Sequence, residues 1–483
     1  MDSDDYENAC RKRHSRFDRR FFIGVLSTSI YCRPGCPAGV PRKENVKLYK
    51  SAAAASAAGF QPCLRCRPEA FPSTTAWNGS SWKIYRALRL IDQGFLDEQS
   101  VEELAEFLKV GPRQLIRLFN DHLGASPVEV AQTRRLHFAK KLIVETHMSF
   151  SDVSFAAGFG SLGGFNAALR KTYKLSPTQL REKCNVDRKK TERDDIVECT
   201  VPYCLPFDWA AMLSFFAYRA VPGVEVVTAY SYARTFCLEG EAGHFEAFFE
   251  PASHQIRMRI TYPEIRYLRR IIDRVCSLFD LKADSNRIDQ FLAKDSELAP
   301  MVRRFPGLRV PGCWSGFEVA VRAILGQQIT VKAASTLVAR IVERYGKAYQ
   351  CCAEGLQFTF PEPAQLVDAD LTGMGIVGQR IAAIQAVAGQ IGCGELDIEG
   401  GMDPDNFVRT ICSIKGIGEW TAQYIAMRAL NDPNAFPYSD LILRRAVSEP
   451  GVTMTPKALL KRAESWQPWR AYCVMLLWRN YAS

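Results

Sequence analysis

Long apolar runs, a leader-like start and nucleotide-binding fingerprints are all missing from this chain of 483 residues. No segment approaches 18 consecutive apolar residues, so we expect neither a membrane-spanning helix nor a membrane partner. The first twenty residues hold no apolar stretch, so we expect no secretory signal peptide. No Walker A sequence occurs and no full dinucleotide-binding fingerprint is recognised, so use of ATP or NAD is not implied.

A disulfide framework is also missing, although the chain has 16 cysteines. Outside one cluster near the N-terminus the cysteines are scattered, and neighbours such as Cys351 and Cys352 do not easily bridge to each other. Reduced thiols in the cytoplasm are therefore expected.

Composition and charge describe an ordinary globular protein with one basic part. Hydrophobic residues make up 47% and charged residues 24%, and a chain of this length fits three or four domains. Residues 1–200 hold 32 Lys and Arg against 23 Asp and Glu, which is most of the net charge of +10. This excess suits a nucleic-acid partner, although a generally basic, soluble surface is an equal alternative on charge alone.

Four cysteines form the strongest local pattern, two close pairs separated by 26 residues: Cys32, Cys36, Cys63 and Cys66. This spacing predicts a tetrahedral site for one Zn²⁺ in a small domain. The flanking sequences IYCRPGCPAG and GFQPCLRC are rich in arginine and turn residues, which points to a polyanionic partner. A purely structural zinc ribbon is the alternative that spacing alone favours.

Two helix-turn-helix units are predicted within residues 82–183, joined by a long helix around 128–146. In the first unit an apolar face, Val101, Leu104, Phe107 and Leu108, precedes a Gly-Pro break at 111–112. The recognition helices would present to the major groove Arg113, Gln114 and Arg117, and then Ser161, Leu162, Gly163 and Asn166. A solvated helix face is the alternative, and Gly163-Gly164 leaves few side chains to read bases.

The remaining boundaries follow from changes in composition. Residues 184–198 are predicted to be a charged linker, residues 199–285 a small α+β domain, and residues 286–483 helical, after a cysteine module at 1–75. In the last part Lys415, Gly416 and Gly418 form a glycine hairpin between helices, whose backbone N–H groups suit a DNA phosphate. Asp440 follows about twenty residues later, where a helix N-cap is the alternative role.

The N-terminal half resembles two known families. Residues 17–70 are similar to the N-terminal domain of the Ada family, which implies that Cys32 accepts a methyl group irreversibly from a DNA methyl phosphotriester. Four thiolates on Zn²⁺ carry a net charge of −2, and methylation leaves −1, so affinity for DNA should rise. The segments AAGFGSLGGFNAALRK and LSP resemble the AraC-type double helix-turn-helix.

From Phe207 to Trp478 the chain resembles the AlkA family, the helix-hairpin-helix 3-methyladenine DNA glycosylases II, in segments such as KGIGEWTAQYIAMRAL and WQPWRAYCVMLLW. The resemblance implies base flipping, and Asp440 as the acid that stabilises an oxocarbenium-like sugar. It also implies an aromatic base pocket with a supporting arginine, although packing in the core is the usual role of such rings: Phe215, Trp420, Tyr424, Trp478, nearby Trp209, and Arg219. It further implies a wedge at Gln327 and Gln328 and a monovalent cation held by carbonyls near Cys412, Ile414 and Ile417.

Three sequence features of related repair proteins are missing from this chain, and each absence narrows the expected activity. Trp420 stands where lyase-type relatives carry a Schiff-base lysine, so a monofunctional enzyme that leaves an abasic site is predicted. Only Cys473 follows the hairpin region, so we expect no iron–sulfur cluster. No Pro-Cys-His-Arg sequence occurs, so repair of O6-methylguanine is not expected.

The sequence therefore predicts a multidomain fusion: a zinc α+β module, an all-α double helix-turn-helix, a small TBP-like α+β domain and all-α glycosylase lobes. We expect a base-excision repair enzyme for alkylated double-stranded DNA that also accepts methyl groups and regulates transcription. Two alternatives stay open, a methylation-activated transcription activator and a glycosylase whose N-terminal half only targets DNA. RNA polymerase is an expected partner of the activator, and we expect a monomer in the cytoplasm, associated with the nucleoid.

Overall fold

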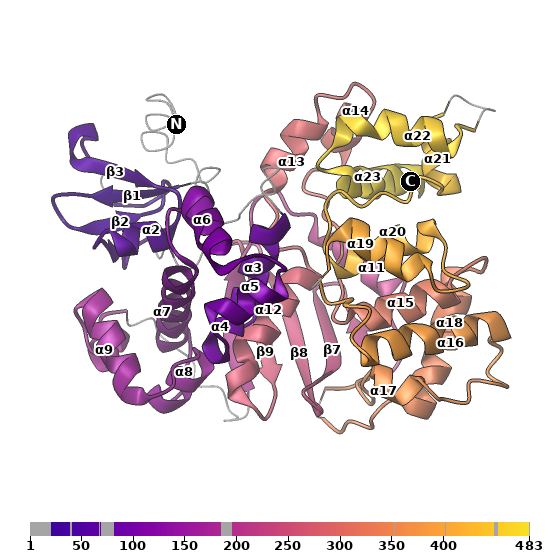
Figure 1. The fold of residues 1–483 in the computed structure, drawn as a ribbon, viewed down its shortest axis with the longest axis horizontal. Helices are drawn as coiled ribbons and strands as arrows, with labels where there is room; N and C mark the ends of the chain where they lie inside the picture. The colour runs from indigo at the N-terminus through magenta and orange to yellow at the C-terminus, as the bar shows by residue number, and fades with distance from the viewer. Residues whose placement is uncertain are drawn as a thin grey trace. The chain divides into compact units, whose positions relative to one another are not determined.

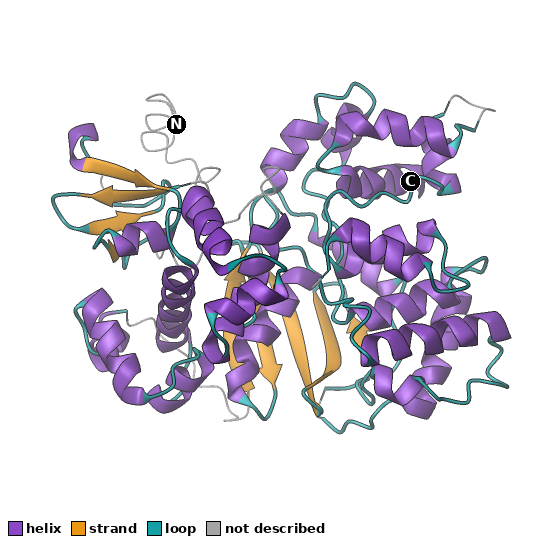
Figure 2. Cartoon of the chain, viewed as in Figure 1, coloured by secondary structure: helices purple, strands orange, loops and turns teal. Residues whose placement is uncertain are grey.

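A computed structural model describes residues 21–38, 41–66, 68, 82–184, 196–351, 353–400, 402–448 and 453–482. Two compact units make up the chain, residues 1–202 with 264–273, and residues 203–263 with 274–483. Figure 1 labels their elements, and Figure 2 separates the helices from the strands. The expected linker at 184–198 lies mostly outside the described residues, because 185–195 are not among them.

The first unit begins with a small sheet ordered β3-β1-β2-β4. Strand β1 pairs antiparallel with β2 and β3, and β2 pairs parallel with β4. The side chain of Ser51 caps helix α2, and Gly59 follows that helix at φ 89°. These elements are β1 (Phe22–Val25), β2 (Ile30–Cys32), η2 (Lys43–Asn45), β3 (Val46–Tyr49), α2 (Ala52–Ala57) and β4 (Gln61–Pro62).

Eight helices follow among the described residues of this unit: α3 (Trp82–Asp92), α4 (Phe95–Glu98), α5 (Val101–Phe107), α6 (Pro112–Leu123), α7 (Pro127–Glu145), α8 (Phe150–Ala156), α9 (Leu162–Tyr173) and α10 (Pro177–Lys183). Serine capping boxes begin α5, α7 and α10, and Gly111-Pro112 begins α6. The two predicted helix-turn-helix units are confirmed, with α7 joining them. Phe107 is 39% exposed, unlike the buried Leu104 and Leu108, and its ring packs on Phe95 at 5.8 Å at the edge of the core.

The cysteine module packs on the helices of the same unit. Tyr31, beside Cys32 on β2, has its hydroxyl 2.7 Å from Nε2 of His137 on α7. The hydroxyl of Ser51 donates to the carbonyl of Leu123 at 2.8 Å, at the end of α6. These contacts join the cysteine module to the first helix-turn-helix unit and to the connecting helix α7. Strand β5 (Ile196–Pro202) ends the unit's N-terminal segment.

The second unit holds the predicted small α+β domain. Strands β6, β7, β8 and β9 pair in that order, each antiparallel to its neighbour. Buried aromatic rings fill the space beside this sheet, and the Tyr232 and Phe279 rings meet edge to face at 5.5 Å. The elements are α11 (Trp209–Ala217), β6 (Glu225–Val227), β7 (Ser231–Leu238), β8 (Glu241–Glu250), β9 (Gln255–Thr261), η4 (Ile265–Tyr267) and α12 (Leu268–Leu278), of which η4 and the start of α12 belong to the first unit.

Helices make up the rest of the second unit (Figure 1). Helix α20 is its buried centre and packs against α15 and α19. The bounds are α13 (Ser285–Leu292), α14 (Leu298–Arg304), α15 (Gly316–Leu325), α16 (Val331–Tyr345), α17 (Pro363–Leu366), α18 (Gly378–Gly392), α19 (Pro404–Cys412), α20 (Glu419–Ala429), α21 (Leu441–Ala446), α22 (Pro456–Arg462), η5 (Ala463–Trp466) and α23 (Arg470–Ala482). No helix among the described residues is long and apolar enough to span a bilayer.

A buried ion network joins the sheet to α15 inside this unit. Arg234 on β7 donates to Glu318 on α15 at 2.7 Å, and Arg322 pairs with both Glu318 and Glu225. Arg322 also donates to the backbone carbonyl of Arg219 at 3.0 Å. The network therefore fixes the segment after α11, which carries the predicted pocket residue Arg219.

Candidate functional sites

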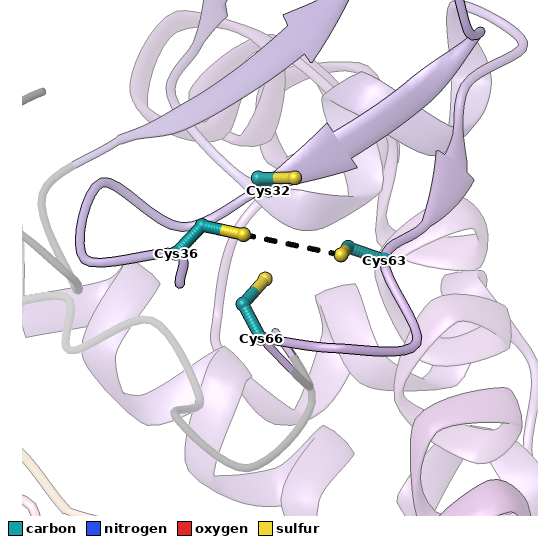
Figure 3. Close-up of side chains that lie close together, drawn as sticks. All are labelled: Cys32, Cys36, Cys63 and Cys66. Atoms are coloured by element: carbon teal, nitrogen blue, oxygen red, sulfur yellow. Dashed lines mark hydrogen bonds between the residues drawn. The ribbon is translucent and has the colours of Figure 1, made fainter. Parts of the chain in front are cut away.

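The four predicted zinc ligands converge in the first unit (Figure 3). Strand β2 ends with Cys32, a turn supplies Cys36, and the loop after β4 supplies Cys63 and Cys66. All four sulfur atoms lie within 4.8 Å of one another, and those of Cys36 and Cys63 are 4.0 Å apart. Sulfur atoms at about 2.3 Å from a tetrahedral Zn²⁺ are about 3.8 Å apart, so the four thiols fit one zinc ion.

The four cysteines differ in their exposure. Cys36, Cys63 and Cys66 are buried, at 9%, 6% and 2% exposed, whereas Cys32 is half-buried. Arg33 follows it, and its Nε donates to the carbonyl of Cys66 at 2.9 Å, which holds a cation beside the cluster. Taken over all its atoms, Cys32 is therefore the least buried of the four residues.

The helix-turn-helix faces are displayed as the sequence predicts, with one qualification. The side chains of Arg113, Gln114 and Arg117 are exposed on α6. Around the start of α9, Ser161, Leu162 and Gly163 are exposed and Asn166 is half-buried. The Ser161 hydroxyl accepts from the N–H of Gly164 at 3.1 Å, so it caps the helix and is less available to a base.

Asp440 is held by three hydrogen bonds in the second unit. Its Oδ2 accepts from the indole N–H of Trp420 at 2.8 Å. Its Oδ1 accepts from the indole of Trp478 at 3.3 Å and from the backbone N–H of Leu443 at 2.9 Å. Asp440 is thus the N-cap of α21 and at the same time accepts hydrogen bonds from two indoles.

Three aromatic rings lie together beside this carboxylate, and one of them, Tyr424, contacts the two tryptophans that donate to it. Trp420 and Tyr424, one turn apart on α20, stack with centroids 5.4 Å apart and planes 6° apart. Trp478 on α23 lies 6.3 Å from Tyr424 at 47°. All three residues are half-buried, so their rings are partly open to a ligand. The structure therefore brings together Asp440 and three of the predicted pocket rings.

Phe215 lies beside two arginines. The guanidinium of Arg219 is 3.9 Å from the Phe215 ring centre, and that of Arg428 is 4.8 Å away. Burial lowers the pKa of Arg219 below its ordinary value. Burial alone would raise the pKa of Tyr424, but Arg428 and Arg219 lower it below the ordinary value. A cationic base would meet positive charge at Phe215 and at Tyr424, so the two tryptophans are better stacking surfaces.

Arg428 is a residue that sequence reasoning missed. Its side chain is buried and donates to Tyr424 Oη at 2.9 Å, to the carbonyl of Pro311 at 2.8 Å and to that of Gly312 at 2.7 Å. It follows Trp420 and Tyr424 at steps of four along α20, which is the spacing that could have identified it.

Trp209 occupies a different environment from the other predicted pocket rings. It is 5% exposed, stacks on Phe249 at 5.5 Å and meets Phe279 at 5.0 Å. Within the described residues it makes no ring contact with Trp420, Tyr424 or Trp478. These contacts favour the role in the hydrophobic core that the sequence left open.

The hairpin and the predicted wedge are joined. Gly416 has φ 97°, a conformation that favours glycine, and Gly418 is the N-cap of α20 beside the exposed Lys415. The side-chain amide of Gln327 donates to the carbonyl of Gly416 at 2.9 Å. Gln328 is exposed at φ 57°, at the tip of the loop. Gln327 is therefore bonded to the hairpin, whereas Gln328 is exposed to solvent.

Four families match successive parts of the chain. They are the metal binding domain of Ada (residues 5–69), a helix-turn-helix domain (104–183), the AlkA N-terminal domain (198–315) and the HhH-GPD superfamily of base excision DNA repair proteins (321–471). The Ada match covers the four-cysteine cluster, and the HhH-GPD match covers the hairpin and Asp440. The first domain thus contains a Cys₄ site for one zinc ion.

Full-length similarity extends across both units. The probable bifunctional transcriptional activator/DNA repair enzyme AlkA of Mycobacterium tuberculosis is 36% identical, over 98% of this chain and 96% of its own. DNA-3-methyladenine glycosylase 2 of Escherichia coli is 32% identical over 56% of this chain and 94% of its own. The 3-methyladenine DNA-glycosylase structure from Archaeoglobus fulgidus, 24% identical, covers 59% of this chain and 98% of its own with a TM-score of 0.53, which supports the fold. The chain belongs to the family of bifunctional transcriptional activator/DNA repair enzymes that join an Ada-type zinc domain and an AraC-type helix-turn-helix to an AlkA-type glycosylase.

Proposed function

We propose that the second unit hydrolyses the N-glycosidic bond of alkylated bases of the 3-methyladenine type in double-stranded DNA. The observation that supports this most is the Asp440 carboxylate, fixed by Trp420 and Trp478 at the edge of a group of aromatic rings. A flipped base would stack on these rings while its sugar faces the carboxylate. A cation over such a ring gains about 1–2 kcal/mol when it is desolvated, which favours N-alkylated purines.

The chemical step uses the charge that the damage supplies. An N-alkylated purine is cationic, so it takes the electron pair of the glycosidic C–N bond and leaves as a neutral base. The sugar carbon develops positive charge, which the carboxylate of Asp440 stabilises. Water then adds to that carbon and loses its proton, which leaves an abasic site.

The enzyme is proposed to be monofunctional because Trp420 replaces an amine nucleophile. An indole offers no lone pair that could form a Schiff base with the sugar, and its N–H already donates to Asp440. The abasic strand should therefore stay intact after base release.

DNA is proposed to be held by the hairpin and opened by Gln328. The backbone around Lys415, Gly416 and Gly418 would bind a phosphate at the start of α20. Gln327 is committed to the hairpin through its bond to Gly416, so the exposed Gln328 is the better wedge for the gap left by a flipped base. Carbonyls near Cys412, Ile414 and Ile417 are the proposed ligands of a monovalent cation.

The first unit is proposed to accept methyl groups on Cys32. Zn²⁺, when bound, keeps the four sulfurs as thiolates. Cys32 Sγ forms a bond to the methyl carbon of a methyl phosphotriester, and the carbon–oxygen bond breaks with its electron pair left on the phosphate oxygen. The phosphodiester anion is restored and Cys32 becomes a thioether, so no other reactant is needed. The half-buried state of Cys32 beside three buried ligands supports this assignment.

The helix-turn-helix domain is proposed to place both activities on DNA and to regulate transcription. Activation would involve RNA polymerase, in line with the activator names of the relatives. We also propose a monomer, and DNA as substrate supports a cytoplasmic, nucleoid-associated protein. We propose domain boundaries at 1–75, 82–183, 199–285 and 286–483, with the linker at 184–198.

One incubation tests both activities. Duplex DNA carrying radiolabelled methyl groups is mixed with the wild type, Cys32→Ala or Asp440→Asn, and label is counted in free bases and in protein. Free methylated bases should disappear only with Asp440→Asn, and protein label only with Cys32→Ala. Protein label that never appears would reduce the zinc domain to DNA targeting, and base release that persists in Asp440→Asn would remove the glycosylase mechanism.

A further inference from the structure

A cavity of about 570 Å³ lies beside the zinc cluster in the first unit. Its walls include Cys32, Cys36 and Cys63 from the cysteine module. The opposite wall comes from the second helix-turn-helix unit, through residues 173–175 at the end of α9 and Lys183 at the end of α10. The site next to the acceptor thiol is therefore built by two domains that are separate in the sequence.

The walls of this cavity are of two chemical kinds. Much of the lining is apolar, with Ile30, Pro34, Leu64 and Leu175 as members. Cationic residues also line it: Arg33, Arg65, Lys174 and Lys183. The helix-turn-helix unit supplies the two lysines, both exposed.

Lys174 and Lys183 are available to an external anion. Lys174 is the C-cap of α9 at φ 55°, and Lys183 is the last residue of α10. Neither forms an ion pair or side-chain hydrogen bond within the described part of the chain, whereas Lys141 of the same unit pairs with Glu145. A lysine left unpaired beside an apolar cavity is suited to a phosphate of a bound strand.

These walls favour a methylated phosphate over an ordinary one. A methyl phosphotriester is neutral, so entering an apolar cavity costs it less than it costs a phosphodiester anion. The thiolate cluster, at a net charge of −2 with zinc bound, repels the anion as well. The phosphates on either side of the lesion keep their charges, however, because DNA carries about one charge per 1.7 Å of helix axis. Cationic side chains are therefore needed to bind these flanking phosphodiesters while the neutral methyl phosphotriester reaches Cys32.

We propose that Lys174 and Lys183 of the helix-turn-helix unit are part of the methyl-acceptor site and bind the phosphodiesters that flank the lesion. This rests on the proposed function of Cys32. The methyl transfer then depends on the second helix-turn-helix in two ways. The unit places the protein on DNA, and its two lysines bind the flanking phosphodiesters beside the Cys32 thiol. Neither lysine touches the reacting atoms, so both are positioning residues.

The test measures the second-order rate of methyl transfer to Cys32 for two substrates. One is a duplex with a single methyl phosphotriester, and the other is a dinucleoside methyl phosphotriester, which has no flanking phosphate. The protein variants are Lys174→Ala/Lys183→Ala and the control Lys171→Ala, an exposed α9 lysine that does not line the cavity. Zinc content is determined for each, so that loss of the cluster is detected.

We expect the double variant to lose roughly 10-fold in rate on the duplex at low salt. The slope of log rate against log salt should fall by about 1.8, the value for two phosphate contacts. Its rate on the dinucleoside should equal that of the wild type, and Lys171→Ala should match the wild type on both substrates. Equal rates for the double variant and wild type on the duplex would overturn the proposal, as would a matching loss on the dinucleoside. A wild type that accepts no methyl from either substrate would instead overturn the function of Cys32 on which the proposal rests.

Discussion

The indole N–H of Trp420 lies 2.8 Å from Oδ2 of Asp440, a residue twenty positions further along the chain. Trp420 follows the hairpin glycines on α20, and Asp440 caps α21, so one hydrogen bond joins the glycine hairpin to the carboxylate. The residue that replaces a lyase lysine thus also orients the carboxylate. The same tryptophan therefore contributes to the proposed mechanism by its ring and by its N–H.

Trp420→Phe separates these two contributions. Phenylalanine keeps an aromatic face next to Tyr424 but removes the donor to Asp440. A hydrogen bond to a charged group contributes about 1.5–3 kcal/mol, so single-turnover base release should slow by about 10- to 100-fold. Binding to DNA that contains an abasic-site analogue should change little. A rate equal to that of the wild type would show that this hydrogen bond does not position the acid.

Gln328 is predicted to be the wedge and Gln327 the brace. Gln328→Ala should weaken binding to an abasic-site duplex by about 1–2 kcal/mol, by analogy with loss of one stacking contact, with little change for undamaged DNA. Gln327→Ala should weaken binding to both, because its amide holds the carbonyl of Gly416. Fluorescence anisotropy with matched duplexes measures the four constants. Selective loss of abasic-site binding in Gln327→Ala alone would reverse the two roles.

Removal of zinc should abolish methyl transfer by the first unit and leave base release by the second unit intact. The sulfurs of Cys32, Cys36, Cys63 and Cys66 lie within 4.8 Å of one another, and small Cys₄ modules lose their fold without metal. After chelation, methyl transfer should stop while base release continues, because Asp440 and its aromatic rings belong to the second unit. Added zinc should restore methyl transfer unless Cys32 was already methylated. Simultaneous loss of base release would contradict the independence of the two activities.

The buried ion network predicts a defined acid sensitivity. Burial alone would raise the pKa of Glu225, but Arg322 and Arg234 lower it to about 2 from an ordinary value of 4.5. A depressed pKa stabilises the fold above pH 4.5, and this contribution is lost as pH falls towards 2. Urea unfolding of Glu225→Gln, followed by tryptophan fluorescence, should show about 3 kcal/mol lower stability at pH 7 and a flatter dependence between pH 4.5 and 2.

The control for that experiment is Glu250→Gln. Glu250 pairs with Arg257 at 2.9 Å but is 42% exposed, so its replacement should change stability by less than about 1 kcal/mol. Equal pH profiles for wild type and Glu225→Gln would show that the network contributes no acid-sensitive stability.

Local signals in the sequence are enough to predict much of the fold. Ser100, Ser126 and Ser176 each stand before a helix with an acid or amide three residues later, and each forms a capping box. The spacing of the four cysteines predicted a cluster because each pair is closed by a short turn. These features depend only on residues close together in the chain, so they can be predicted from the sequence without knowledge of the fold.

Contacts between distant segments were harder to predict. The partners of Arg428, the carbonyls of Pro311 and Gly312, lie more than a hundred residues away, and a helical arginine carries no sign of them. The sequence does not distinguish the environments of Trp209 and Trp420. Trp209 packs in the core, whereas Trp420 is half-buried and donates to Asp440. Lys174 joins the cavity of Cys32 only through packing between two domains.

The most direct test follows single-turnover base release from a duplex with one N-alkylated purine, using the wild type and Asp440→Asn, with borohydride present in a parallel reaction. Asparagine can still cap α21 but carries no charge. We predict that the wild type leaves an intact abasic strand that breaks only in alkali, that borohydride traps no covalent complex, and that Asp440→Asn is at least about 100-fold slower. Base release by Asp440→Asn at the wild-type rate, or a trapped protein–DNA adduct, would contradict this mechanism.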